Sequence, residues 1–172
     1  MDAKYAYTVY LEAAFDSLPV AGEDVDVVET FTYLGSVLHR STSCEAEVNR
    51  RLGLAMGAMK SLDKSVWRSR YLSRRTKVRV FGSLVMPVLL YSCEAWTLTA
   101  DLRRRLDSFA TTSLRRILGY SWQDRVSNQQ VLREAGMSRV TCLIRERQLR
   151  FYGHVVRFPM DDPINPSNAN CN

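Results

Sequence analysis

The stretch from Trp67 to Trp96 constrains the fold of this chain most, because it joins a cationic segment directly to an apolar one. The cationic half carries six basic residues within twelve positions: Arg68, Arg70, Arg74, Arg75, Lys77 and Arg79. No acidic residue lies between Asp63 and Glu94. The other half, 80–93, is uncharged and mostly apolar, which is too short to span a bilayer and typical of a buried core helix. We therefore expect a helix that is basic and solvated at one end and buried at the other, and that holds a polyanion against a rigid body.

The charge of the chain is distributed unevenly. Residues 1–30 carry one lysine and seven acidic groups, a net −6, whereas the whole chain of 172 residues is +6, so that the remainder is +12. A polyanionic partner therefore belongs to the second part. The alternative is that the arginine-rich helices are ordinary solvated faces. A hydrophobic content of 46% argues against wholesale disorder. The length of 172 residues is enough for one domain, or for one domain with an appendage.

The cysteines and histidines do not form a metal-binding pattern. Cys44, Cys93, Cys142 and Cys171 include no Cys-x-x-Cys pair, and neither His39 nor His154 completes a zinc spacing with them. We interpret the cysteines as reduced, mostly buried thiols. The N-terminal segment MDAKYAYTVYLEAAF lacks the basic start and apolar run of a signal peptide. An intracellular protein, nuclear or cytoplasmic, with no membrane partner is expected.

The first forty residues predict a small β element. Residues 5–18 favour a short strand followed by a short helix, which Pro19 would end. Residues 20–28 alternate valine with aspartate around a Gly22-Glu23 turn, which is typical of a β-hairpin with one buried face. The segment FTYLGS predicts a strand that stops at the permissive backbone of Gly35.

Five helices are expected after this element, so the fold is predicted to be mainly α, a helical bundle with a small β-hairpin near the N-terminus. Thr42 and Glu45 form a capping box for a helix to about Leu62. The expected inward residues of this helix are Val48, Leu52, Ala55, Met56 and Met59. Its Gly53 and Gly57 are weak points, for which close packing would compensate.

The other four helices are predicted from caps and breakers. Ser73 caps the central helix, and Pro87 should kink it or end it near Met86. Thr99 or Asp101 starts the next helix, which Gly119 ends, and Ser127 with Gln130 caps a short helix over 128–135 before Gly136. The buried stripe expected in the longer of these two comprises Leu102, Leu106, Phe109, Ser113 and Ile117.

The last helix is expected from Ser138 to about Phe158, before a disordered tail. Its predicted inward residues are Leu143, Ile144, Phe151, Tyr152, Val155 and Val156, and its predicted outward residues are Arg145, Arg147 and Arg150. The expected domains are thus a β remnant over 1–40, a helical domain over 41–158 and a tail over 159–172.

Five phrases of the sequence, taken in order, resemble the region downstream of the catalytic palm in reverse transcriptases of non-LTR (LINE-type) retrotransposons. They are FTYLGS, CEAEVNRRLGLAMGAMKSL, VFGSLVMPVLLYSCEAWTL, LRRILGY and RFYGHVVR. The family has a Phe-x-Tyr-Leu-Gly segment at the end of the palm, here 31–35. A helical thumb and connector follow, with the Leu-Leu-Tyr-x-x-Glu-x-Trp phrase at 89–96 and the Gly-His-Val-x-Arg phrase at 153–157. The resemblance covers roughly 20–158 and implies a truncated RNA-directed DNA polymerase that binds RNA, DNA or an RNA–DNA hybrid.

The palm motifs that carry catalysis in this family are missing. The segment LEAAFDSLP resembles the family's Asp-Leu-x-x-Ala-Phe-Asp motif, but Tyr10 stands where the first, metal-binding aspartate is expected. A phenol is neutral near pH 7 and does not replace a carboxylate in a site for two Mg²⁺ ions. The second metal-binding turn is also missing, because Asp161-Asp162 in the tail is the one Asp-Asp pair of the sequence. We expect no polymerase activity from this chain by itself, no catalytic or metal-binding residue, and no cofactor, although the parent family uses Mg²⁺.

Three interpretations of function remain at this stage. The first is a catalytically inactive remnant that binds nucleic acid non-specifically through basic helices, with the six basic residues above and Arg103, Arg104, Arg115 and Arg116 as candidate phosphate contacts. The second is a polymerase that borrows its palm from another polypeptide. The third is a helical protein-interaction module or a non-functional remnant. Loss of the palm would also expose an apolar face and so allow self-association.

Several aromatic residues were assigned to the core rather than to base stacking: Phe31, Tyr33, Trp67, Tyr71, Trp96 and Trp122, together with Leu34, Leu89 and Leu90. Aromatic rings beside arginines can stack on bases, but at a helix boundary they are more often core anchors. His154 is interpreted as a packed histidine rather than as a catalytic or metal-binding one.

Overall fold

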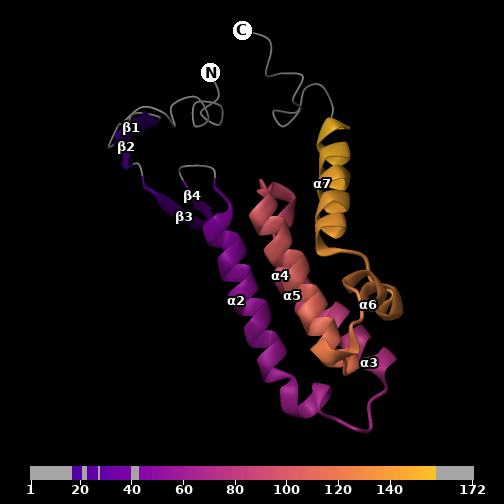
Figure 1. Ribbon diagram of the computed structural model, residues 1–172. Helices are drawn as coiled ribbons and strands as arrows, with labels where there is room; N and C mark the ends of the chain where they lie inside the picture. Colours follow the sequence, from indigo (N-terminus) through magenta and orange to yellow (C-terminus); the bar gives the residue numbers. More distant parts are fainter. Residues whose placement is uncertain (1–16, 21–22, 27, 40–42, 158–172) are drawn as a thin grey trace. The chain divides into compact units, whose positions relative to one another are not determined.

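The computed structural model describes residues 17–20, 23–26, 28–39 and 43–157 (Figure 1). The chain divides into two compact units, 1–48 and 49–172, and each is considered by itself. The predicted strand and helix over 5–16, the capping residue Thr42 and the tail lie outside the described residues.

The first unit contains two antiparallel hairpins. Strand β1, Ser17–Val20, pairs with β2, Glu23–Asp26, in the register Leu18 opposite Val25. Strand β3, Thr30–Tyr33, pairs with β4, Ser36–His39, with Phe31 opposite Leu38. The predicted β-hairpin is confirmed, but Pro19 lies within β1 instead of ending the structure before it. A proline is tolerated there because both strands of a two-stranded sheet are edge strands.

The turn between β3 and β4 has the backbone that the sequence predicts. Leu34 and Gly35 have φ angles of 47° and 73°, and two positive φ angles define the type I′ turn that suits a two-residue hairpin loop. The expectation that Phe31 and Leu34 are core residues is wrong, since 55% and 75% of their surfaces are exposed. Leu34 forms the tip of the turn, and a two-stranded ribbon offers little surface that could cover either side chain.

The second unit is helical from its start, and helix α2 crosses from the first unit into it. The α-helices are α2, Glu45–Ser61; α3, Arg74–Val80; α4, Met86–Leu89; α5, Ala100–Leu118; α6, Asn128–Ala135; and α7, Val140–Val156. Two π-helical segments, η1 (Asp63–Trp67) and η2 (Phe81–Val85), and two 3₁₀ turns, η3 (Cys93–Ala95) and η4 (Trp122–Asp124), complete the described part. Because η2 joins α3 to α4, residues 74–89 form one helical stretch. The predicted mainly α fold with about five helices is therefore confirmed.

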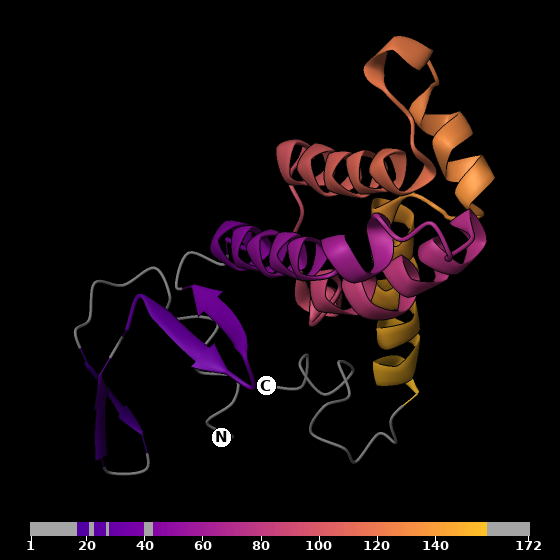
Figure 2. The ribbon, with the colours of Figure 1, turned by 90° about the horizontal axis from the view of Figure 1, so that it is seen from below.

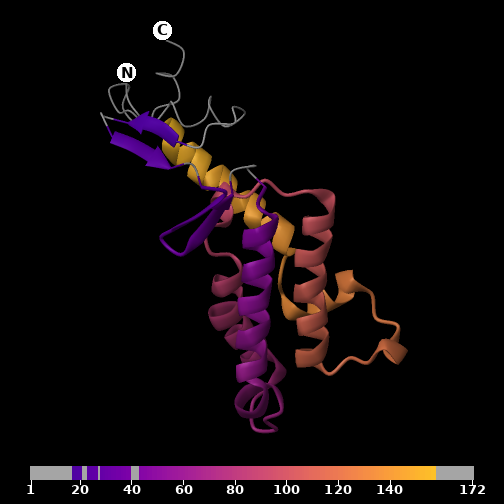
Figure 3. The same ribbon diagram turned by 90° about the vertical axis from the view of Figure 1, so that its left-hand side faces the viewer.

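The core of the second unit lies among α2, the stretch 74–89, α5, α6 and the first half of α7 (Figures 1 and 3). Its fully buried large side chains are Phe81, Val85, Leu89, Leu106, Leu114, Val131, Val140 and Ile144. All five residues of the predicted α5 stripe are buried, and Thr99 caps this helix while Gly119 ends it with a φ of 78°. The predicted boundaries and cap of α6 are confirmed as well.

Helix α2 corrects two expectations. Met56 is 55% exposed, although it was expected to face inward with Leu52 and Met59. Gly53 and Gly57 are not compensated by close packing, because a Cβ atom built on either glycine would meet nothing within 4 Å. Both glycines therefore lie on an open face of the helix.

Pro87 does not end the central helix at Met86, because the helix continues to Leu89. The π-helical segment Phe81–Val85 lies directly before the α4 turn that contains the proline. Proline cannot donate a hydrogen bond to the preceding turn, and a π-turn is one of the backbone adjustments that accommodate such a loss.

Helix α7 is anchored by hydrogen bonds to neighbouring elements along its first half. Asp107 of α5 accepts hydrogen bonds from the Thr141 amide (3.1 Å) and hydroxyl (3.0 Å), and so caps α7 from another helix. Further along, Arg147 donates to the Leu90 carbonyl (3.1 Å), and Gln148 donates to the carbonyls of Cys93 (3.3 Å) and Trp96 (2.7 Å). These bonds give a second donor to the carbonyls of Leu90 and Cys93, which also accept from the amides of Cys93 (3.4 Å) and Trp96 (3.3 Å), and they give a donor to the Trp96 carbonyl.

The second half of α7 differs from the prediction. Phe151, Tyr152 and Val156 were expected to face inward, but they are 53%, 65% and 46% exposed. In Figure 2, this half of α7 extends past the rest of the second unit. The expectation that these three side chains face inward is wrong, because the described residues of this unit do not cover them.

Candidate nucleic-acid interface

The basic block begins beside a well-anchored tryptophan. Trp67 is buried, and its indole Nε1 donates a hydrogen bond to the Met59 carbonyl (2.7 Å). Lys77 of α3 donates from Nζ to the Trp67 carbonyl (2.8 Å). Ser73 caps α3 by accepting a hydrogen bond from the Thr76 amide (3.1 Å), as predicted. The loop of residues 68–73 is therefore held at both ends.

Three of the six basic residues of the block are engaged within the protein. Arg68 forms an ion pair with Asp63 (2.9 Å), whose carboxylate also binds Arg116 (2.5 Å). Arg74 lies 3.6 Å from Glu134 of α6. Lys77 is half-buried and holds the Trp67 carbonyl, as described above. These cations link neighbouring elements, which lowers their availability to a polyanion.

The other three basic residues, Arg70, Arg75 and Arg79, are exposed, and no carboxylate of the described residues pairs with them. Arg75 and Arg79 are four positions apart on α3 and so share one face of the helix. That face continues through Gly82 and Ser83, which are exposed and uncharged. We define Arg70, Arg75 and Arg79 as the open basic set.

Most of the candidate arginines of α5 also bind other groups within the protein. Arg103 is exposed, whereas Arg104 pairs with Asp101 on the same helix. Arg115 donates to the Val126 carbonyl and to Asn128 Oδ1 (2.9 Å), and so fastens the connection between α5 and α6. Of the predicted phosphate contacts, the open basic set and Arg103 thus lack a partner among the described residues. The sequence analysis did not identify Asp63 as the partner of Arg68 and Arg116, or Glu134 as the partner of Arg74. Glu134 and Arg116 are both distant in the sequence from the residues with which they pair.

The aromatic residues near the basic block differ in how far they are buried. Trp67 is a core anchor, as predicted, and so is Trp96. Tyr71 was also assigned to the core, but this is wrong: the residue is 100% exposed, because it lies in the loop before α3 rather than on a helix face. The side chain of Trp122 is outside the described part. His154 was expected to be packed and is instead exposed.

The described residues contain no group of three or more His, Cys, Asp or Glu side chains that could hold a metal ion. Tyr10 and the Asp161-Asp162 pair lie outside these residues. Within the same part of the chain, every helix is either too short or too polar to cross a bilayer.

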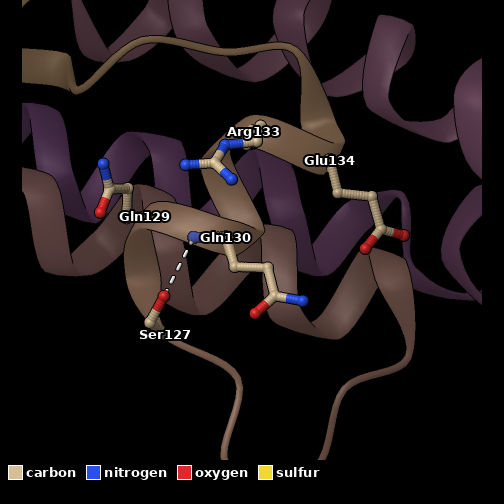
Figure 4. A pocket seen from close by; sticks show the side chains of 5 residues that line it. All are labelled: Ser127, Gln129, Gln130, Arg133 and Glu134. Atoms are coloured by element: carbon tan, nitrogen blue, oxygen red, sulfur yellow. Dashed lines mark hydrogen bonds between the residues drawn. The ribbon is translucent and has the colours of Figure 1, made fainter.

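Several hollows lie on the surface of the second unit. One of about 360 Å³ lies against α6, with Ser127, Gln129, Gln130, Arg133 and Glu134 around it (Figure 4). Ser127 accepts a hydrogen bond from the Gln130 amide, and the arginine and glutamate point in different directions. The geometry of this hollow does not bring a nucleophile, a base and an acid together.

Comparison with known proteins finds similarity to a family of unknown function and to a transposon-derived protein. A family model described as a domain of unknown function (DUF6451) matches residues 61–91, which include the basic block. A protein of Caenorhabditis elegans, whose name describes it as uncharacterized and transposon-derived, is 25% identical over 143 residues. That alignment covers 81% of this chain and 50% of the relative, so the chain spans half the length of that protein. No solved structure matches.

Proposed function

We propose that the chain is a fragment of a non-LTR retrotransposon reverse transcriptase, and that its helical unit binds nucleic acid without catalysing polymerisation by itself. The transposon-derived relative supports the origin, and the five phrases shared with the family supply its finer assignment. The observation that carries the binding function is the open basic set. It lies within the acid-free sequence 64–93, so that local carboxylates do not neutralise it.

The chemistry of this surface suits phosphate recognition without sequence readout. Exposed guanidinium groups bind phosphate oxygens bidentately and release condensed counterions from the nucleic acid. Contacts of this kind position a backbone but do not distinguish bases. The absence of polymerase activity is proposed because Tyr10 replaces the metal-binding aspartate of the parent family.

A fluorescence-anisotropy titration with a labelled RNA–DNA hybrid at several salt concentrations tests the proposal. The triple variant Arg70→Ala, Arg75→Ala and Arg79→Ala should bind more weakly, with a salt slope reduced by about 2 to 3 units, because each lost phosphate contact removes about 0.9. A control variant with Arg68→Ala, Arg74→Ala and Arg104→Ala has the same net charge but removes arginines that already have carboxylate partners. Its salt slope should change by less than about one unit.

Equal slopes for the two variants would show that net charge alone governs binding and that the open basic set is not an interface. Failure of the wild-type chain to bind would overturn the proposed function and favour an inert remnant. Primer extension with Mg²⁺ provides the accompanying test of catalysis, and extension by this chain alone would contradict the proposed inactivity.

A further inference from the structure

Tyr71 is the most exposed of the large side chains in the described part, with 100% of its surface accessible. A tyrosine ring usually buries at least one face against the protein. Both faces of this ring are open to solvent, so a planar ligand can approach either one. Arg70, which precedes Tyr71 directly in the sequence, is exposed as well.

The backbone of the loop that carries Tyr71 is held by hydrogen bonds. The Tyr71 amide donates a hydrogen bond to Ser69 Oγ (3.3 Å), and the Ser69 amide donates to the Val66 carbonyl (3.2 Å). The buried Trp67 before the loop and the Ser73 cap after it fix the two ends. Because the loop backbone is already held, it loses little conformational freedom when the ring binds a ligand, which favours affinity.

The electrostatic setting selects the kind of ligand. Arg70, which precedes Tyr71 in the sequence, and Arg75, the second residue of α3, attract phosphate groups, and the nearest acidic residues in the sequence are Asp63 and Glu94. Asp63 is occupied by Arg68 and Arg116. An aromatic ring flanked by unneutralised arginines is the arrangement on which unpaired bases stack while their phosphates are held.

We propose that Tyr71 is a stacking site for an unpaired base, and that this surface therefore prefers single-stranded nucleic acid or a single-stranded end to a continuous duplex. Bases inside a duplex have both faces covered by their neighbours, so the ring can stack only on a base that is unpaired. Arg70 and Arg75 hold the adjoining phosphates. This inference rests on the proposed function and deepens it by naming the form of nucleic acid.

The experiment compares three labelled probes with the full chain by fluorescence anisotropy: an oligo(dT) strand, an abasic strand of the same length, and the oligo(dT) strand paired with oligo(dA). Tyr71→Ala should weaken binding to oligo(dT) by about tenfold or more, since one stacked base contributes about 1–3 kcal/mol. Binding to the abasic strand and the duplex should change by less than about twofold. Tyr71→Phe keeps the ring and should behave as wild type toward all three probes.

Tyr152, which is 65% exposed on α7, provides the matched control, and Tyr152→Ala should leave binding unchanged. The salt slope should be the same in wild type and Tyr71→Ala, because stacking releases no counterions, whereas the variant of the open basic set lowers it. If wild type binds every probe and Tyr71→Ala binds oligo(dT) as well as wild type does, the stacking site is overturned while the proposed function stands. If wild type binds none of the probes, both are overturned.

Discussion

Cys93 is the residue whose environment departs most clearly from that of a free side chain. It is fully buried, and burial, reinforced by the neighbouring carboxylate of Glu94, raises the pKa of its thiol from 9.0 to about 11, which Arg147 only partly offsets. The folded state therefore binds this proton more tightly than the unfolded state does. The resulting stabilisation is fully present below about pH 9 and is lost as the pH rises toward about 11.

This linkage predicts a difference between wild type and Cys93→Ala that depends on pH. The free-energy difference between them in urea unfolding should shrink as the pH rises from 9 to 11, because titrations common to both proteins cancel. Parallel stability curves would contradict the raised pKa. In the native protein, iodoacetamide should also modify the exposed Cys142 and spare Cys93.

Gly53 and Gly57 give a second prediction at this scale. Replacing either with alanine should raise the free energy of unfolding by about 0.5–1 kcal/mol, because alanine favours the helix and its Cβ meets open space. Gly119→Ala is the contrasting control and should destabilise, since a φ of 78° strains any residue with a Cβ. Chemical denaturation measures all three, and a loss of stability in the α2 variants would show that this face is covered in solution.

The sequence predicted residues well where local chemistry decides the outcome. Thr99, Ser127 and Gly136 are cap positions, and their side-chain oxygens or backbone freedom act within one turn. The division of the basic block could not be predicted in the same way. Whether Arg74 is engaged depends on Glu134, sixty positions away, and whether Lys77 is engaged depends on a backbone carbonyl.

At the scale of elements, α7 shows how a helix can be started by its neighbour. Asp107→Ala should lower the free energy of unfolding by about 1 kcal/mol, within a range of about 0.5–2, because the capped amide and hydroxyl of Thr141 lose their acceptor. Ser108→Ala, an adjacent exposed position, should change stability by less than about 0.5 kcal/mol. Urea denaturation followed by circular dichroism checks both, and equal effects would contradict the capping role.

Helices were predictable where the repeat of apolar residues lies between a clear capping residue and a residue that ends a helix. The α5 stripe repeats every three or four residues between a threonine cap and a glycine, and its helix follows that pattern. The π-turn before Pro87 was not predictable, since proline only forbids a hydrogen bond and does not specify how the backbone responds. The Asp107 cap was not predictable either, because it requires knowing which helix lies beside α7.

At the scale of the whole molecule, α7 exposes several apolar side chains. The chain also spans only half the length of its relative. We expect this surface to associate with a second copy of the chain when no other partner is present. Sedimentation velocity should show association that rises with concentration and falls in the double variant Phe151→Ser and Tyr152→Ser. Leu54→Ser, which removes an exposed apolar side chain from α2, is the control. A wild-type chain that stays monomeric at every concentration would contradict this prediction.

The hydrogen bonds that anchor the first half of α7 also affect how fast different parts of the helix open. A helix opens most readily where few tertiary bonds must break with it. Amide protons between Leu143 and Gln148, beneath the Asp107 cap and the Arg147 bond, should therefore exchange with deuterium far more slowly than those from Leu149 to Val156. The residue at which exchange changes from slow to fast would mark the end of the part of α7 that is packed in the core.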